Sequence, residues 1–423
     1  MAVLYSIFIE VFIIVFKLFA MFNAKARKGL LGRNTAIDAV QSQLNGKSVI
    51  WMHAASLGEY EQGLPVLEQL KTEFPDSKIL ISFFSPSGYE NVIKKENIAD
   101  LIIYLPFDRK STMQKLVNAM DVKIFFTVKY DYWYHLLRAL KSKNTKIFVV
   151  SALFYEGQVF FKMYGGWFSK QLKTCLDWAF HQTVGSSALA KSVGINQSSV
   201  TGDTRFDRVK QLKNRDNHVP FISEYVFNRR SIVLGSSWDA EEKAAQVLHK
   251  KLPKTKLIIA PHDLKRVPHL RLLFPQALLY SEINERTDLE SNVLIIDSIG
   301  LLSKLYSYAT LAVVGGGFHS AGLHNILEAA AFGIPVFFGD QYKKNPEADA
   351  LIKMNGGKNF SDEFAMAGYI EELIKSANRT PIDEVSTLKE MSENAKFFVE
   401  SQPYATKKIL AKILSFFPEK TVV

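Results

Sequence analysis

The chain has 423 residues, 48 % of them hydrophobic and 22 % charged, and this globular composition excludes a disordered or fibrous protein. Its length predicts two domains of roughly 180–200 residues each, because one core seldom spans more. Lysine and arginine exceed aspartate and glutamate by 52 − 42 = 10, which favours an anionic partner such as a phosphate, a nucleotide or an acidic lipid. The one cysteine, Cys175, excludes an internal disulfide and a cysteine-rich zinc site, and favours a cytosolic setting.

The segment Val3–Phe22 is apolar except at Ser6, Glu10 and Lys17. About 20 such residues match the hydrocarbon core of a bilayer, and we expect residues 1–24 to form a membrane-anchor helix. Glu10 and Lys17 share a helical face, so the helix either spans the membrane or lies in its interface. A buried core helix is the alternative. Basic residues follow directly and place the rest of the chain on the cytoplasmic side: Lys25, Arg27, Lys28 and Arg33.

From Ser48 onward, short β-like runs alternate with amphipathic stretches. The predicted strands of the first series are Val49–Met52, Ile79–Ser82, Leu101–Tyr104, Ile124–Val128 and Ile147–Val150. The predicted helices between them are Glu61–Glu73, Ser87–Lys95, Met113–Met120 and Tyr132–Lys141. This alternation predicts a parallel sheet with crossover helices.

A second series of strands begins at Ser231. Its predicted strands are Ser231–Leu234, Lys256–Ala260, Val293–Ile296, Leu311–Val314 and Val336–Phe338, with helices at Glu241–Lys250, Gly300–Tyr308 and Asn325–Phe332. The polar stretch Lys210–Asn228 between the two series predicts the domain junction. We therefore expect α/β domains at 25–210 and 211–423, both doubly wound and facing a cleft, with the last helix packing back on the first domain.

The block from Trp51 to Glu59 follows the first predicted strand directly. Its small residues and Gly58 allow a tight turn, so Glu59 is expected at the mouth of the sheet, where a helix begins. A partly desolvated glutamate there suits a general base. The alternative is a structural glutamate that stabilises the start of the helix.

A glycine-rich loop, Gly315–Gly317, follows a strand of the second domain and precedes Asn325 and Glu328. Free backbone N–H groups at such a turn suit a phosphate, and Glu328 could accept hydrogen bonds from ribose hydroxyls. The glycine spacing differs from the dinucleotide fingerprint. A capped strand–helix turn is the alternative.

Other loops fall at predicted strand ends, and each alone is a weak signal. In the second domain they are Gly235–Ser237, Pro261–Asp263 and Asp297–Gly300. In the first domain, Tyr130–His135 could line an acceptor pocket or pack the domain top. Between the domains, Arg205 could neutralise an anion. No metal-ligand motif is present, so we expect no metal and no cofactor.

These motifs, in this order, resemble the 3-deoxy-D-manno-octulosonic acid (Kdo) transferases of lipopolysaccharide synthesis. The resemblance covers nearly the whole chain and includes His53–Glu59, Leu105–Asp108, Thr201–Asp207, Gly235–Ser237, Asp297–Gly300, Gly315–Gly317, His324–Glu328 and Gly333–Val336. It implies the two-domain glycosyltransferase fold called GT-B, CMP-Kdo as donor and a lipid A precursor, lipid IV-A, as acceptor. It also implies a site at the cytoplasmic face of the inner membrane.

By the same resemblance, Glu59 matches the catalytic base, Asp131 a partner acid and Arg205 a basic residue that stabilises the transition state. The residues that match the CMP contacts are Pro261, His262, Ile299, Gly300, Leu301, Asn325, Ile326, Leu327 and Glu328. Three positions depart from the family: Lys129 replaces a glutamate, Asp131 shortens another, and His262 replaces an arginine. Arg266 or His262 itself could supply the missing charge.

Two other functions remain open at this point. One is a GT-B transferase that uses a UDP-sugar on a lipid-linked acceptor. The other is a non-catalytic, membrane-associated nucleotide-binding protein, which the changes at Lys129 and His262 make conceivable. Nucleic acid is not an expected partner, because the basic charge comes without a recognition motif.

Overall fold

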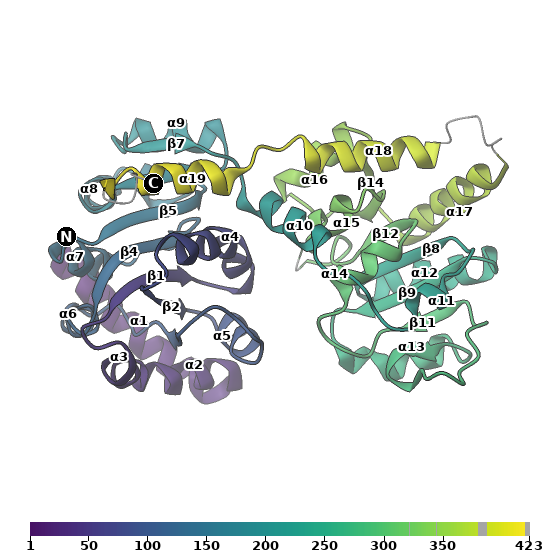
Figure 1. The fold of residues 1–423 in the computed structure, drawn as a ribbon, viewed down its shortest axis with the longest axis horizontal. Helices are drawn as coiled ribbons and strands as arrows, with labels where there is room; N and C mark the ends of the chain where they lie inside the picture. The colour runs from purple at the N-terminus through teal and green to yellow at the C-terminus, as the bar shows by residue number, and fades with distance from the viewer. Residues whose placement is uncertain (321, 344, 380–386, 419–423) are drawn as a thin grey trace. The chain divides into compact units, whose positions relative to one another are not determined.

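The computed structural model describes residues 1–320, 322–343, 345–379 and 387–418. The chain divides into two compact units, the first comprising Met1–Arg208 with Pro403–Val423 and the second Val209–Gln402 (Figure 1). The sequence placed the boundary two residues later, between 210 and 211. Both the observed and the predicted boundary fall inside helix α10, whose bounds are Thr204–Asn214.

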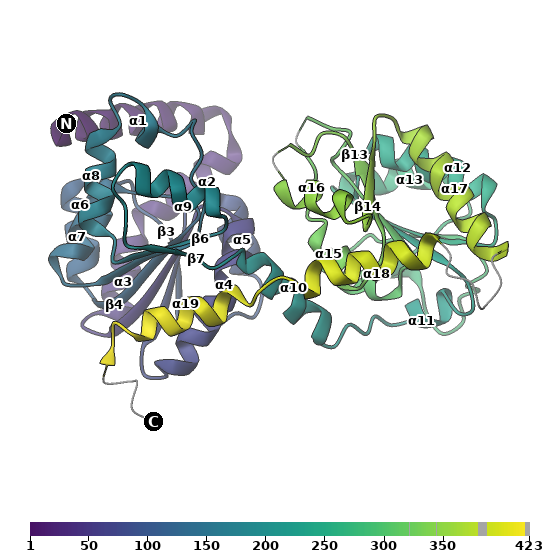
Figure 2. The ribbon, with the colours of Figure 1, turned by 90° about the horizontal axis from the view of Figure 1, so that it is seen from above.

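The first unit contains a parallel sheet and the helices that cover it (Figures 1 and 2). Its elements are α1 Ala2–Phe22, α2 Ala24–Asn34, α3 Ala36–Leu44, β1 Ser48–Ala54, α4 Leu57–Glu73, β2 Lys78–Phe83, α5 Pro86–Val92, β3 Leu101–Tyr104, α6 Lys110–Asn118, β4 Asp121–Val128, α7 Tyr134–Ser142, β5 Lys146–Ala152, the 3-10 turn Val159–Phe161, α8 Gly166–Cys175, β6 Trp178–His181, α9 Val184–Ser192, β7 Ser198–Val200 and α19 Ala405–Leu414.

The strand order of the first sheet is β3-β2-β1-β4-β5-β6-β7, and every pairing is parallel. Both faces of β1 are buried: Val49 and Trp51 enter one apolar cluster, and Ile50 and Met52 enter the other. This explains why the central strands are almost continuously apolar. The chain reverses its direction of winding between β1 and β4, and in such sheets ligands bind at the strand carboxyl ends beside that reversal.

The second unit begins within α10 and is built in the same way. Its elements are α11 Ile222–Tyr225, β8 Ser231–Ser237, α12 Asp239–Lys251, β9 Lys256–Pro261, the 3-10 turn Leu264–Arg266, α13 Val267–Leu273, β10 Leu278–Leu279, the 3-10 turn Tyr280–Glu282, β11 Val293–Ile295, α14 Leu302–Leu305, the 3-10 turn Tyr306–Tyr308, β12 Leu311–Val314, α15 Leu327–Ala331, β13 Val336–Gly339, α16 Pro346–Lys353, β14 Gly357–Phe360, α17 Glu363–Arg379 and α18 Thr387–Glu400.

The second sheet has the order β10-β11-β9-β8-β12-β13-β14 and is parallel throughout. Its winding reverses between β8 and β12, where Val313 lies opposite Leu234. The predicted pair of doubly wound α/β domains is therefore confirmed. The chain returns to the first unit after Gln402, and α19 packs beside α4 (Figure 2).

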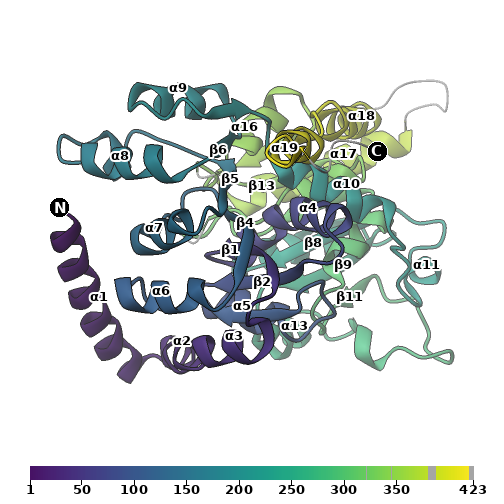
Figure 3. The ribbon, with the colours of Figure 1, turned by 60° about the vertical axis from the view of Figure 1, so that its left-hand side comes forward.

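Helix α1 is long and apolar enough to cross a membrane, and only 11 % of its most apolar window is buried. Figure 3 shows α1 running across the ends of α6 and α7. Its buried apolar residues are Ile9, Ile13 and Ala20. The alternative of a buried core helix is therefore wrong for this segment, because most of its surface stays exposed.

Candidate active site

Glu59 lies at the carboxyl end of β1, in the first turn of α4, as the sequence predicted. Its side chain is 9 % exposed, and the hydroxyl of Ser56 donates a hydrogen bond of 2.8 Å to Glu59 Oε2. The carboxylate is held by its burial, by the hydrogen bond from Ser56 and by its place in the first turn of α4. It therefore lies beside the point where the sheet reverses its winding.

Asp131 lies just beyond β4, the strand next to β1, and ends a chain of hydrogen bonds. The indole N–H of Trp51 donates to Ser82 Oγ (2.8 Å), and His53 Nδ1 lies 2.8 Å from the same oxygen. His53 Nε2 lies 2.6 Å from Asp131 Oδ2. His53 Nδ1 also lies 3.0 Å from the Ser82 carbonyl oxygen, and the Nε2–H donates to the Asp131 carboxylate. The buried imidazole therefore orients the carboxylate.

Tyr130 directly precedes Asp131 on the loop after β4. Burial and the charges of Glu59 and Asp131 raise the pKa of its hydroxyl, so both acids act on the same phenol. The preceding residue, Lys129, has φ 63°, in the left-handed region that side chains seldom occupy. Such strain is typical of functional turns. The pKa of Tyr130 is sensitive to the charges of both Glu59 and Asp131.

Arg205, the third predicted catalytic residue, is held by Asp203. Its Nη2 lies 2.7 Å from Asp203 Oδ2, and its backbone N–H donates to Asp203 Oδ1. Asp203 also accepts a hydrogen bond of 2.6 Å from Gln62, which is one helical turn beyond Glu59 on α4. The guanidinium is therefore placed beside α4, with its charge partly met by a carboxylate.

Aromatic side chains connect α1 to the loop that carries Asp131. The indole N–H of Trp133 donates to Asp131 at 3.2 Å, and its ring stacks on Phe84 with 5.2 Å between centroids. Phe12 and Phe16 of α1 pack against Phe84. Through these aromatic contacts, helix α1 therefore lies beside the loop that carries Asp131 in the same unit.

Arg33, on α2, packs against the same group of aromatic side chains. Its guanidinium carbon lies 4.7 Å from the ring centre of Phe84 and 5.0 Å from that of Phe107, and Nη2 donates to the Phe84 carbonyl. Burial lowers the pKa of Arg33 to about 10, which leaves it charged at neutral pH. The cation is stabilised by aromatic faces and backbone oxygens.

In the second unit, the glycine-rich loop follows β12 as predicted, but its amides are largely occupied. Gly315 N–H donates to Gly235 O, and Gly316 N–H donates to the buried carboxylate of Glu241 at 3.1 Å. A Cβ on Gly315 would lie 2.0 Å from Ser236 O, so only glycine fits there. The expectation of free backbone N–H groups is therefore wrong for Gly315 and Gly316.

The helix expected at Asn325–Phe332 is shorter, with bounds Leu327–Ala331. Asn325 precedes it, and its Oδ1 accepts the N–H of Leu327 at 3.1 Å. Its Nδ2 donates to Glu328 Oε1, also at 3.1 Å. Asn325 and Glu328 are therefore paired with each other on this turn.

A stack of rings, which the sequence did not predict, joins three loops at this sheet edge. Trp238 stacks between His262 and His319, with 4.5 Å to each ring centre. His324 lies 4.6 Å from His262, and burial with the charge of His262 lowers the pKa of His324 to about 4. A tryptophan directly after Gly235–Ser237 was the signal that could have indicated this platform.

Pro261 ends β9, and the N–H of His262 donates to Ser237 O, so the predicted donor contacts and the ring stack share one edge. Arg266 forms a bidentate pair with the fully buried Glu242, at 2.7 and 2.6 Å. Its charge is therefore already met by a carboxylate, and burial lowers the pKa of His262.

Ile299, Gly300 and Leu301 form an exposed turn before α14. Gly300 has φ 99°, and Ile299 is 77 % exposed. Within the described residues, no group of three or more His, Cys, Asp or Glu side chains could hold a metal ion.

Residues 25–208 match the model of a family described as "3-Deoxy-D-manno-octulosonic-acid transferase (kdotransferase)". A 3-deoxy-D-manno-octulosonic acid transferase of Aquifex aeolicus is 26 % identical over 352 residues, which cover 82 % of this chain and 92 % of that protein. A bifunctional glycosyltransferase/methyltransferase of Fusobacterium nucleatum is 26 % identical over 391 residues, 88 % of this chain. The alignment spans only 58 % of the Fusobacterium protein.

Among solved structures, a putative UDP-N-acetylglucosamine 2-epimerase from Listeria monocytogenes aligns with a TM-score of 0.59 at 15 % identity, covering 88 % of this chain and 97 % of that one. At this identity the similarity concerns the fold alone. The predicted GT-B class and the resemblance stated above are confirmed, whereas the site residues stay predictions.

Proposed function

Because residues 25–208 match the model of the Kdo transferase family, we propose that the chain transfers Kdo from CMP-Kdo to a lipid A precursor, lipid IV-A. The observation that carries this proposal is a buried glutamate, Glu59, at the winding reversal of the matched unit. Relatives named as Kdo transferases align over most of the chain, which supports the same donor.

In the proposed reaction Glu59 takes the proton of an acceptor sugar hydroxyl. The oxygen forms a bond to the anomeric carbon of Kdo while the bond from that carbon to the CMP phosphate breaks, so CMP leaves with the electron pair. One direct displacement inverts the anomeric centre, through an oxocarbenium-like transition state. Asp131, oriented by His53, is proposed to hold the acceptor beside Glu59.

The second unit is proposed to bind the donor through Pro261, His262, Ile299–Leu301 and Asn325–Glu328. The paired side chains Asn325 and Glu328 suit sugar hydroxyls. Arg205 is proposed to stabilise the charge that develops on the departing phosphate, with Asp203 fixing its orientation. We propose that the reaction needs no metal and no cofactor.

Helix α1 is proposed to hold the enzyme at the cytoplasmic face of the inner membrane, lying in the plane of the interface. Two of its polar residues are held by the domain: Tyr5 donates to Asp108, and Glu10 pairs with Arg109 at 2.5 Å. A spanning orientation would break these contacts. The opposite face is more than half exposed and apolar, at Val3, Leu4, Ile7, Phe8, Val11, Ile14, Val15, Leu18, Phe19, Met21 and Phe22.

The experiment that tests the proposal compares Glu59→Gln with Glu73→Gln, which removes one carboxylate at the far end of the same helix. Loss of a general base lowers the rate by about 10²–10⁴-fold. We expect that loss of Kdo transfer in Glu59→Gln, with CMP binding within a few fold of wild type, and normal turnover in Glu73→Gln. Near-normal transfer by Glu59→Gln would refute the assignment of the base.

A further inference from the structure

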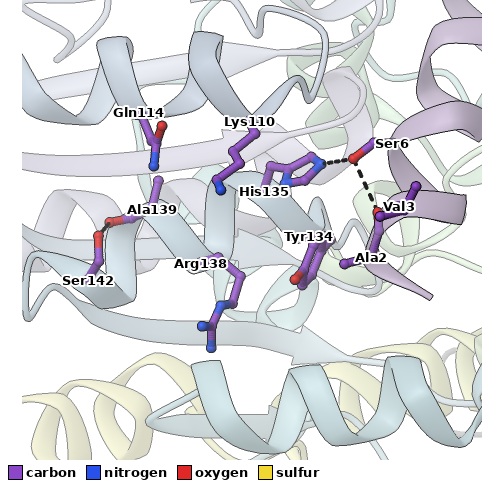
Figure 4. A pocket seen from close by; sticks show the side chains of 10 residues that line it. All are labelled: Ala2, Val3, Ser6, Lys110, Gln114, Tyr134, His135, Arg138, Ala139 and Ser142. Carbon is purple, nitrogen blue, oxygen red and sulfur yellow. Dashed lines mark hydrogen bonds between the residues drawn. The ribbon is translucent and has the colours of Figure 1, made fainter.

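A cavity of about 380 Å³ opens between the first turns of α1 and the helices α6 and α7 (Figure 4). Its lining residues are Ala2, Val3, Ser6, Lys110, Gln114, Tyr134, His135, Arg138, Ala139 and Ser142. A second cavity of about 430 Å³ shares Ser6, Lys110, Gln114 and His135 with it. The two cavities therefore adjoin each other in the groove between α1 and the domain.

The first cavity is basic. Among the described residues that line it, none is acidic, whereas Lys110 and Arg138 are cationic. Lys110 has no hydrogen-bond or ion-pair partner within the described chain, and Arg138 lies beside the thiol of Cys175. His135 is bound to Ser6 Oγ at 2.9 Å, and burial with the charge of Lys110 lowers its pKa. Lys110 and Arg138 are thus the only lysine and arginine among the described residues that line this cavity.

Acidic residues line only the adjoining cavity, and both are occupied. Glu10 is paired with Arg109. Asp108 accepts hydrogen bonds from the Tyr5 hydroxyl and from the backbone N–H groups of His135 and Leu136, at 2.7, 2.8 and 2.8 Å. Neither carboxylate therefore cancels the charge of Lys110 and Arg138.

The groove lies at the level where α1 would meet a membrane. Val3 lines the cavity and is also 72 % exposed on the apolar face of α1. If that face enters the interface, the cavity opens among lipid headgroups, where the abundant anion is a phosphate. Lysine and arginine are the side chains that bind phosphate in proteins.

We propose that Lys110 and Arg138 bind a phosphate carried by a lipid, either an anionic phospholipid headgroup or the phosphate of the lipid acceptor. This site is separate from Glu59 and Asp131, and the proposal rests on the proposed membrane role of α1. Gln114 and Ser142 supply further polar contacts on the cavity wall. The bound phosphate would fix the orientation of the first unit on the membrane surface.

The test uses the full chain with Lys110→Gln, Arg138→Gln and the double change, and Lys115→Gln as the matched control. Lys115 is exposed on the same helix but does not line either cavity. Binding is measured by flotation with vesicles of phosphatidylcholine alone or mixed with phosphatidylglycerol. Each lost charge is expected to weaken binding to the anionic vesicles about fivefold, without affecting binding to neutral vesicles.

The second arm distinguishes the two sources of phosphate. In micelles of an uncharged detergent, a rise in KM for the phosphorylated acceptor with unchanged kcat identifies the acceptor phosphate. A selective loss of vesicle binding identifies the bilayer lipid. If the double variant behaves like Lys115→Gln in both arms, the site is refuted. Failure of the wild-type chain to bind any vesicle would instead contradict the membrane role of α1. In that case the KM for the phosphorylated acceptor, measured in micelles, decides whether Lys110 and Arg138 bind a phosphate.

Discussion

The contact between Tyr5 and Asp108 is the clearest point at which to test how α1 is attached. Replacing Tyr5 with Phe keeps the ring, which packs edge-on against Tyr134 at 5.3 Å and against His135 at 5.4 Å. It removes a hydrogen bond of 2.7 Å to a carboxylate that is 1 % exposed. A hydrogen bond to a charged group contributes about 1.5–3 kcal/mol, so we expect a loss of that size at pH 8.

The matched control is Tyr134→Phe, because the Tyr134 hydroxyl has no hydrogen-bond partner within the described residues. Its removal is expected to cost less than about 0.5 kcal/mol. Urea unfolding is followed by tryptophan fluorescence, which mainly reports the first unit, since four of the five tryptophans, Trp51, Trp133, Trp167 and Trp178, lie there. Superimposable curves for the two variants would refute the docking of α1 through Tyr5.

Two further predictions concern pH and the nucleotide. Burial raises the pKa of Asp108 to about 6, whereas an unfolded aspartate titrates near ~4. Between about pH 4 and pH 6 the Asp108 carboxyl is therefore protonated in the folded chain but ionised in the unfolded chain. The protonated carboxyl raises the free energy of unfolding, and this contribution is lost as pH rises through about 6. The unfolding free energy of wild type minus that of Asp108→Asn should fall by about 3 kcal/mol over this range, and a flat difference would contradict the burial effect. CMP should stabilise the fold by about 2.7 kcal/mol at a concentration 100 times its Kd, measured by thermal shift, and a larger shift with UDP would favour the UDP-sugar alternative.

The sequence was sufficient for the central strands because they are buried on both faces. The central strand Leu311–Val314 was predicted with the observed bounds, since it is a continuous apolar run between Thr310 and Gly315. The edge strand Leu101–Tyr104 was also predicted with its observed bounds. The edge strand Ser198–Val200 was not predicted, because it is short and polar and its partly exposed side chains leave no periodic pattern. The short pair Leu278–Leu279 was missed for the same reason of length.

The candidate site was predictable only where a motif follows a strand. Glu59 was predicted from its place beyond a strand end, and Asp131 from the resemblance to the Kdo transferases. The pairing of His53 with Asp131 joins residues 78 positions apart, and the stack of Trp238 on His262 joins two different loops. Such contacts depend on strand order, which a single sequence does not specify. Hydrophobic spacing alone predicted a helix that begins at Asn325. In the structure the Asn325 side chain instead accepts the N–H of Leu327, and the helix begins at Leu327.

The most direct test of the central claim is transfer by the purified full chain supplied with CMP-Kdo and tetra-acylated lipid IV-A, with CMP release and lipid mass recorded together. The proposed function predicts CMP release that depends on the acceptor and a lipid product heavier by a Kdo residue. CMP-Kdo left intact in the presence of the acceptor, or a lipid product formed only from a UDP-sugar, would contradict it.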